Sequence, residues 1–136
     1  MTKETKKMAG IIILTVPTIA YGGYFLLTVL SGQADDLALT DFQKSMFRAG
    51  HAHAGVLVIL SLVTLLYVDA ARLSPAWKWA VRVSFPLAAI LVSGGFFAAA
   101  IGRGLTQPNE FIAILFVGVF VLIFGLITLG VGLVRK

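Results

Sequence analysis

Four long stretches of the chain contain no Asp, Glu, Lys or Arg, and short polar segments connect them. They cover positions 9–30, 51–68, 83–101 and 111–134. Each stretch is close to the roughly 20 residues that a helix needs to cross the hydrocarbon of a bilayer. The apolar runs are continuous and do not alternate, so barrel strands are excluded, and a backbone in lipid must satisfy its own hydrogen bonds. The pattern predicts one all-α domain over 1–136, an integral membrane four-helix bundle.

Composition supports this class and excludes others. Hydrophobic residues make up 59% of the 136 positions and charged residues only 12%, whereas a soluble domain carries about 25% charge. The chain has no cysteine, which excludes disulfides, thiolate metal sites and cysteine nucleophiles. The first apolar stretch is too long for the core of a signal peptide, so we expect a true span. No hydrolase triad, phosphate loop or zinc-protease motif is present, and the sequence favours a protein that is not an enzyme.

Basic residues are distributed unequally between the connections. The side with both termini and the connection between spans two and three carries Lys3, Lys6, Lys7, Arg72, Lys78, Arg82, Arg135 and Lys136. The other side carries only Lys44, Arg48 and Arg103. The positive-inside rule therefore places both termini in the cytoplasm, in a multi-pass protein of the cytoplasmic membrane. The net charge of +5 follows from this topology, and no folded basic surface for nucleic acid is predicted.

Several residues carry expectations about packing. Gly118, Gly125 and Gly132 are spaced by seven and predict a seam of close helix approach. The hydroxyl of Tyr21 needs a partner in lipid, so Tyr21 should face the bundle interior. Asp69 and Arg72 are three residues apart and are expected to pair near the cytoplasmic side.

The connection before span two contains a helix-start signal. Thr40 is followed three residues later by Gln43, which is the pattern of a capping box, and Asp41 suits the positive end of a helix dipole. The helix of span two should therefore begin near Asp41. Residues 41–50 would form its amphipathic outer start, either upright or in the membrane plane.

The only two histidines stand together in the segment RAGHAHAG, at the outer start of span two. Helix positions two apart point about 200° from each other, so both rings can reach one ion only if Gly50 or Gly55 loosens the turn. Otherwise each ring has its own partner. Imidazole, carboxylate and thioether groups together suit copper or zinc, and a single imidazole can hold a haem iron. Two alternatives remain: a purely structural role for the histidines, with Arg103 and Glu110 as a plain ion pair, and a role in proton or pH sensing. The candidates are His51 and His53 for a cofactor or metal, Glu110 and Met46 as further metal ligands, and Asp41, Arg48 and Arg103 as polar neighbours.

The segment FRAGHAHAGVLVILSL resembles one helix of the haem-copper oxidase subunit I superfamily. In that superfamily a basic residue precedes the haem-ligating histidine at the outer end of the second span, and related small four-span bacterial membrane proteins carry a similar His-x-His. The resemblance implies that His51 or His53 is an axial haem ligand. Those small proteins have an asparagine after the histidines, where this chain has Ala54 and Gly55. There is no second histidine-bearing helix for an oxidase centre, so oxidase activity is not implied.

Three functions remain open from the sequence. The first is binding of a metal ion (copper or zinc) or haem at the outer rim. The second is a structural or accessory subunit of a larger membrane complex. The third is a small transporter formed by a homo-oligomer. The lipid bilayer is the one partner that all three share.

Overall fold

The computed structural model describes residues 1–34 and 37–135 and contains four long helices. They are α1 (Lys3–Leu30), α2 (Asp41–Val68), α3 (Pro75–Ala99) and α4 (Ile112–Val134). All four are long and apolar enough to cross a membrane. Lys136, counted above among the basic residues, lies outside the described residues. The all-helical class and the number of helices are thus confirmed.

Helices α1, α2 and α3 begin before their apolar stretches, and side chains cap the starts of α1 and α2. Thr40 caps α2, its side chain accepting from the backbone of Gln43 while the Gln43 side chain accepts from the backbone of Thr40, so the predicted capping box is confirmed. In α3 the first turn starts at Pro75, whose fixed backbone angle suits this position. Helices α1 and α3 therefore extend beyond the predicted spans toward the end of the bundle that holds the termini.

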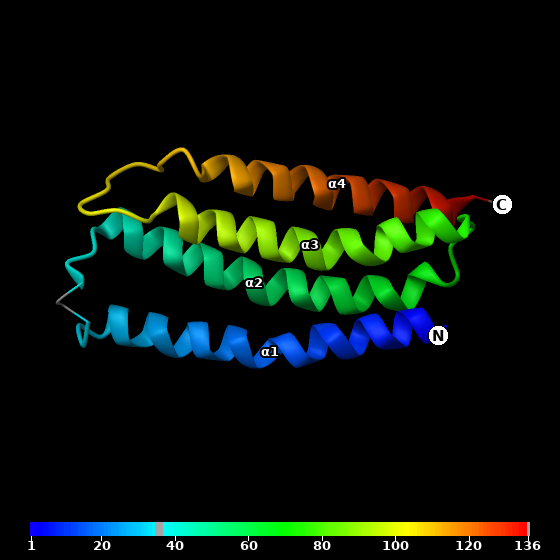
Figure 1. Cartoon of the computed structure of the whole chain (residues 1–136), viewed down its shortest axis with the longest axis horizontal. Helices are drawn as coiled ribbons and strands as arrows, with labels where there is room; N and C mark the ends of the chain where they lie inside the picture. The colour runs from blue at the N-terminus through cyan, green and yellow to red at the C-terminus, as the bar shows by residue number, and fades with distance from the viewer. Residues whose placement is uncertain (35–36, 136) are drawn as a thin grey trace.

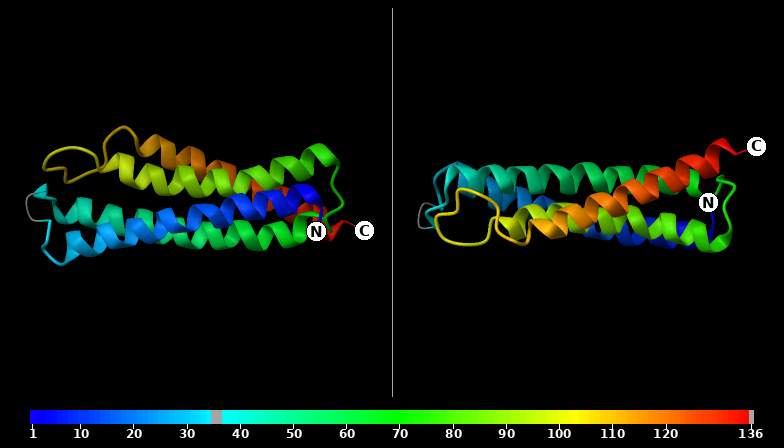
Figure 2. Two further views of the ribbon diagram at one scale, coloured as in Figure 1. Left: turned by 60° about the horizontal axis from the view of Figure 1, so that its bottom comes forward. Right: turned by 90° about the horizontal axis from the view of Figure 1, so that it is seen from above.

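The four helices run antiparallel and lie side by side in chain order (Figure 1). Helix α3 packs extensively on both α2 and α4, while α1 packs mainly on α2. Figure 2 shows the same arrangement from two further directions, with the described chain beginning and ending at one end of the bundle. We call this the terminal end (residues 1–8, 68–78 and 131–135) and the other the far end (residues 30–34, 37–51 and 96–111).

Glycines allow α3 and α4 to approach closely, as predicted. Gly118, Gly125 and Gly132 are all buried. A Cβ atom on Gly118 would lie 2.7 Å from the backbone nitrogen of Val92, and one on Gly125 would overlap the Ser84 hydroxyl. Substitution of Gly118 or Gly125 would push α3 and α4 apart, whereas a side chain at Gly132 would meet Leu73 in the connection between α2 and α3.

Helix α1 is the least enclosed of the four. Only 6% of its most apolar window is buried within the chain, against 50% for α3. The prediction that Tyr21 faces the interior is wrong, since this residue is 74% exposed. The neighbouring glycines, Gly22 and Gly23, form the face that approaches α2, and the larger Tyr21 points away from it.

Candidate functional site

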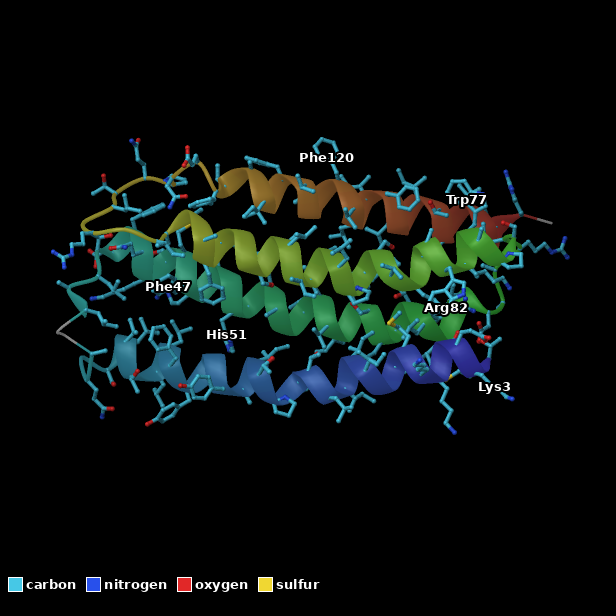
Figure 3. All side chains as sticks on the ribbon, in the orientation of Figure 1. Lys3, Phe47, His51, Trp77, Arg82 and Phe120 are labelled. Carbon is cyan, nitrogen blue, oxygen red and sulfur yellow. The ribbon has the colours of Figure 1, made fainter. Side chains whose placement is uncertain are left out.

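His51 lies on α2 and projects toward α1 (Figure 3). A Cβ atom added to Gly23 would lie 3.2 Å from Nε2 of His51, and one added to Gly22 would lie 3.7 Å from Nδ1. The glycine pair of α1 therefore makes the space that the half-buried imidazole occupies. Because Nε2 faces the backbone of α1, this ring has no room for a porphyrin at that nitrogen while α1 stays in place.

His53 has a different environment on the same helix. Its Nδ1 lies 2.8 Å from the backbone oxygen of Ala49, one turn earlier in α2. A carbonyl oxygen can only accept, so in the neutral ring Nδ1 carries the hydrogen and Nε2 keeps its lone pair. The ring also packs on Phe96 of α3, with centroids 4.8 Å apart. His53 is exposed, and the hydrogen bond at Nδ1 leaves Nε2 as the ring nitrogen that could bind a metal ion.

The two imidazoles thus contact different helices, as the helical period requires. Helix α2 continues without a break through Gly50, whose absent side chain instead admits Phe97, so the turn is not loosened. Within residues 1–34 and 37–135, no group of three or more His, Cys, Asp or Glu side chains is placed to hold a metal ion. The structure therefore does not bring His51, His53 and Glu110 together.

The other candidates are dispersed around the far end. Arg48 donates to Ser45 at 3.4 Å on its own helix, Arg103 and Glu110 are exposed in the connection between α3 and α4, and Met46 is half-buried on α2. Asp41 occupies the first turn of α2, as predicted. The plain ion pair expected between Arg103 and Glu110 is not formed, since the one ion pair in the described part of the chain lies elsewhere.

Backbone hydrogen bonds from polar side chains fix the far end. Gln43 is 2% exposed, and its Nε2 donates at 2.8 Å to the carbonyl oxygens of both Ala100 and Gly102. Thr40 donates through its hydroxyl to the carbonyl of Leu105. Gln43 thus closes the end of α3 as well as capping α2, a role that its spacing from Thr40 alone does not reveal.

A polar cluster at the terminal end was not foreseen. Arg82, only 5% exposed, contacts the carboxylate of Asp69 at 2.8 Å, so the predicted pair of Asp69 with Arg72 is wrong. The Thr5 hydroxyl donates to the same carboxylate at 2.8 Å, and the Thr2 backbone nitrogen donates to it at 2.7 Å. The physical reason is that α2 ends at Val68 with Asp69 as its C-cap, so the spacing rule for helical pairs does not extend to Arg72.

This cluster controls the ionisation of Asp69. Partial burial would raise the pKa of its carboxyl, but the hydrogen bonds from Thr2, Thr5 and Arg82 outweigh that effect and hold the pKa well below its usual range. Asp69 is therefore ionised at neutral pH and joins α1, α2 and α3 at the terminal end.

Comparison of the chain with protein-family models, with curated proteins and with solved structures found no match. A function must therefore be argued from the geometry of this chain.

Proposed function

We propose that this chain is a four-span protein of the cytoplasmic membrane, with both termini in the cytoplasm, that holds haem through a single imidazole, that of His53. The hydrogen bond from Nδ1 of His53 to Ala49 is the observation that carries the proposal. Ligating histidines usually donate their other ring nitrogen to a carbonyl or carboxylate, which fixes the ring and leaves the ligating nitrogen free.

Haem is favoured over copper or zinc because of the number of protein ligands that each requires. Zinc and copper sites take three or four protein groups, and the described residues offer no such group. A haem iron already has the four nitrogens of its ring, and one protein imidazole can complete a stable attachment. When bound, haem would supply a redox-active iron.

The surroundings of His53 also suit a flat apolar group. Phe96 lies against one side of the ring, and Val56, one turn further along α2, is exposed. His53 would supply the ligating nitrogen, Ala49 would fix its tautomer, and Phe96 would hold the ring plane. Met46 and Glu110 have no part in this proposal.

Absorption spectra of protein purified in mild detergent, with and without added haem, test this proposal. The unmodified protein is expected to show a Soret band, which His53→Ala loses and His51→Ala retains. His51→Ala is the matched control, because it removes an equal side chain one half-turn away that faces α1. Circular dichroism checks that both variants keep their helices.

Two outcomes would contradict the proposal. One is a folded protein that stays colourless when haem is added, which would favour the accessory-subunit or oligomeric-transporter hypothesis. The other is a Soret band that survives His53→Ala.

Reporter fusions test the topology separately. Eight basic residues lie on the side of the termini and three on the other, so a cytoplasmic reporter fused to either terminus is expected to be active. A reporter inserted after Gly104, in the connection between α3 and α4, should be inactive. A reporter that is active at one terminus and inactive at the other would show that the number of spans is odd, and the proposed topology would be wrong.

A further inference from the structure

A cavity of about 490 Å³ opens at the terminal end, between the connection from α2 to α3 and the last turns of α4. Its lining is divided by chemistry. Charged and polar groups come from Arg72, Ser74 and Arg135, and the surface formed by Trp77, Ile127 and Val131 is apolar, with Thr128 as a polar group beside it. A ligand that fills it must therefore be charged or polar at one end and apolar at the other.

Both charged side chains that line this cavity are cationic, Arg72 and Arg135. The acidic group nearest in sequence, Asp69, is already occupied by Arg82. Neither Arg72 nor Arg135 forms an ion pair within the part of the chain that the structure describes. Ser74 precedes α3 and its hydroxyl makes no capping hydrogen bond, so it is available as a donor. Two guanidinium groups and a hydroxyl are the donors that a phosphate group requires.

The apolar part of the lining indicates that the ligand carries an apolar tail. Trp77 lies beside α4 (Figure 3), with its ring 6.0 Å from that of Phe124. Ile127 and Val131 are exposed on the same helix. Tryptophan is enriched at the level of lipid head groups, where one part of its ring is wet and the other apolar. An acyl chain leaving the cavity along α4 would meet mainly apolar side chains, with Thr128 as the one polar group of α4 in the lining.

We infer that this cavity binds the head group of an anionic phospholipid, with its phosphate at Arg72 and Arg135 and its acyl chains along α4. Basic pockets at the cytoplasmic ends of membrane helices bind anionic lipid head groups. Free phosphate would use the arginines but not Trp77, Ile127 or Val131. The inference rests on the membrane topology proposed above and is independent of haem binding at the far end.

Native mass spectrometry of the full chain, released from micelles containing phosphatidylglycerol and phosphatidylcholine in equal amounts, tests the inference. One retained phosphatidylglycerol is expected. The double variant Arg72→Gln/Arg135→Gln should weaken retention about 25-fold, since each basic residue near such a head group contributes about fivefold. The matched control is Lys6→Gln/Lys7→Gln, which removes the same charge from exposed positions of α1 at the same end.

Equal retention of both lipids, or equal losses in the two double variants, would overturn the inference. Displacement of the lipid by inorganic phosphate at millimolar concentration would indicate a phosphate site and not a lipid site. Arg72→Lys/Arg135→Lys keeps the charge and should retain part of the binding, which separates loss of the site from loss of the fold. The mass spectrometry measures lipid binding in micelles and does not depend on the orientation of the chain in a membrane, so failure of the topology in reporter fusions is distinguished from failure of lipid binding.

Discussion

Replacing Gly118 with leucine is expected to lower the free energy of unfolding by about 3 kcal/mol, because the new side chain has no space between α3 and α4. Its Cβ atom alone would lie 2.7 Å from the backbone nitrogen of Val92. A flexible side chain can move aside, as Leu73 can opposite Gly132, but the backbone of α3 cannot move without losing its packing on α2. The loss should appear in a denaturant titration in mixed micelles, followed by far-ultraviolet circular dichroism.

Gly130 provides the control for this experiment. It lies on the same helix, and a Cβ atom added there would meet nothing within 4 Å. Gly130→Leu makes the same change in helix propensity and apolar volume, so it should leave stability unchanged or raise it slightly. If both leucine variants lose the same stability, close approach at Gly118 is not what holds α4 to α3.

The helices and the α4 seam could be predicted because each depends on signals within one segment. Thr40 and Gln43 form a capping box from their spacing alone, and the spacing of Gly118, Gly125 and Gly132 places them on one face. Apolar length gives the number of helices. None of these features requires knowledge of which helix lies next to which.

The candidate site was only partly predictable for the same reason. The helical period already indicates that His51 and His53 point apart, but it does not say that one meets Gly23 and the other Phe96. Those neighbours depend on how α1 and α3 are rotated about their axes. The prediction for Tyr21 considered only that its hydroxyl needs a hydrogen-bond partner. The adjacent glycines allow a closer approach to α2 than Tyr21 does, so they face α2 and Tyr21 is exposed.

The terminal cluster was missed because its members are distant in sequence. Thr5 lies 64 residues from Asp69, and Arg82 lies 13 residues away across a connection. A local spacing rule finds Arg72 instead, whose backbone nitrogen donates to Gly132 at 2.7 Å. The buried charge of Arg82 needs a carboxylate, which Asp69 provides from outside its helix. Thr2 and Thr5, at the start of α1, supply further hydrogen bonds to that carboxylate.

Replacing Asp69 with alanine is expected to cost about 3–5 kcal/mol of stability, because Arg82 would keep its charge in a buried position without a carboxylate. Arg82 is 5% exposed, so water cannot easily take the place of Asp69. The double variant Asp69→Ala/Arg82→Met should recover much of the loss, since it removes the stranded charge. Glu4→Ala is the matched control, because Glu4 is an exposed carboxylate at the same end. A loss with Glu4→Ala as large as that with Asp69→Ala would contradict a specific role for the ion pair.

The free energy of unfolding should also fall at acid pH, because Asp69 is stabilised in its ionised form. Its pKa in the folded protein is lowered, so the unfolded chain takes up the proton first as the pH falls. The stability that the ionised carboxylate contributes is fully present above its ordinary pKa of about 3.9 and is lost progressively below that value. The difference in stability between the unmodified protein and Asp69→Asn should therefore be constant from pH 8 to pH 5 and shrink below about pH 4. A difference that shrinks between pH 8 and pH 6 would mean that another group, and not this carboxylate, controls the terminal cluster.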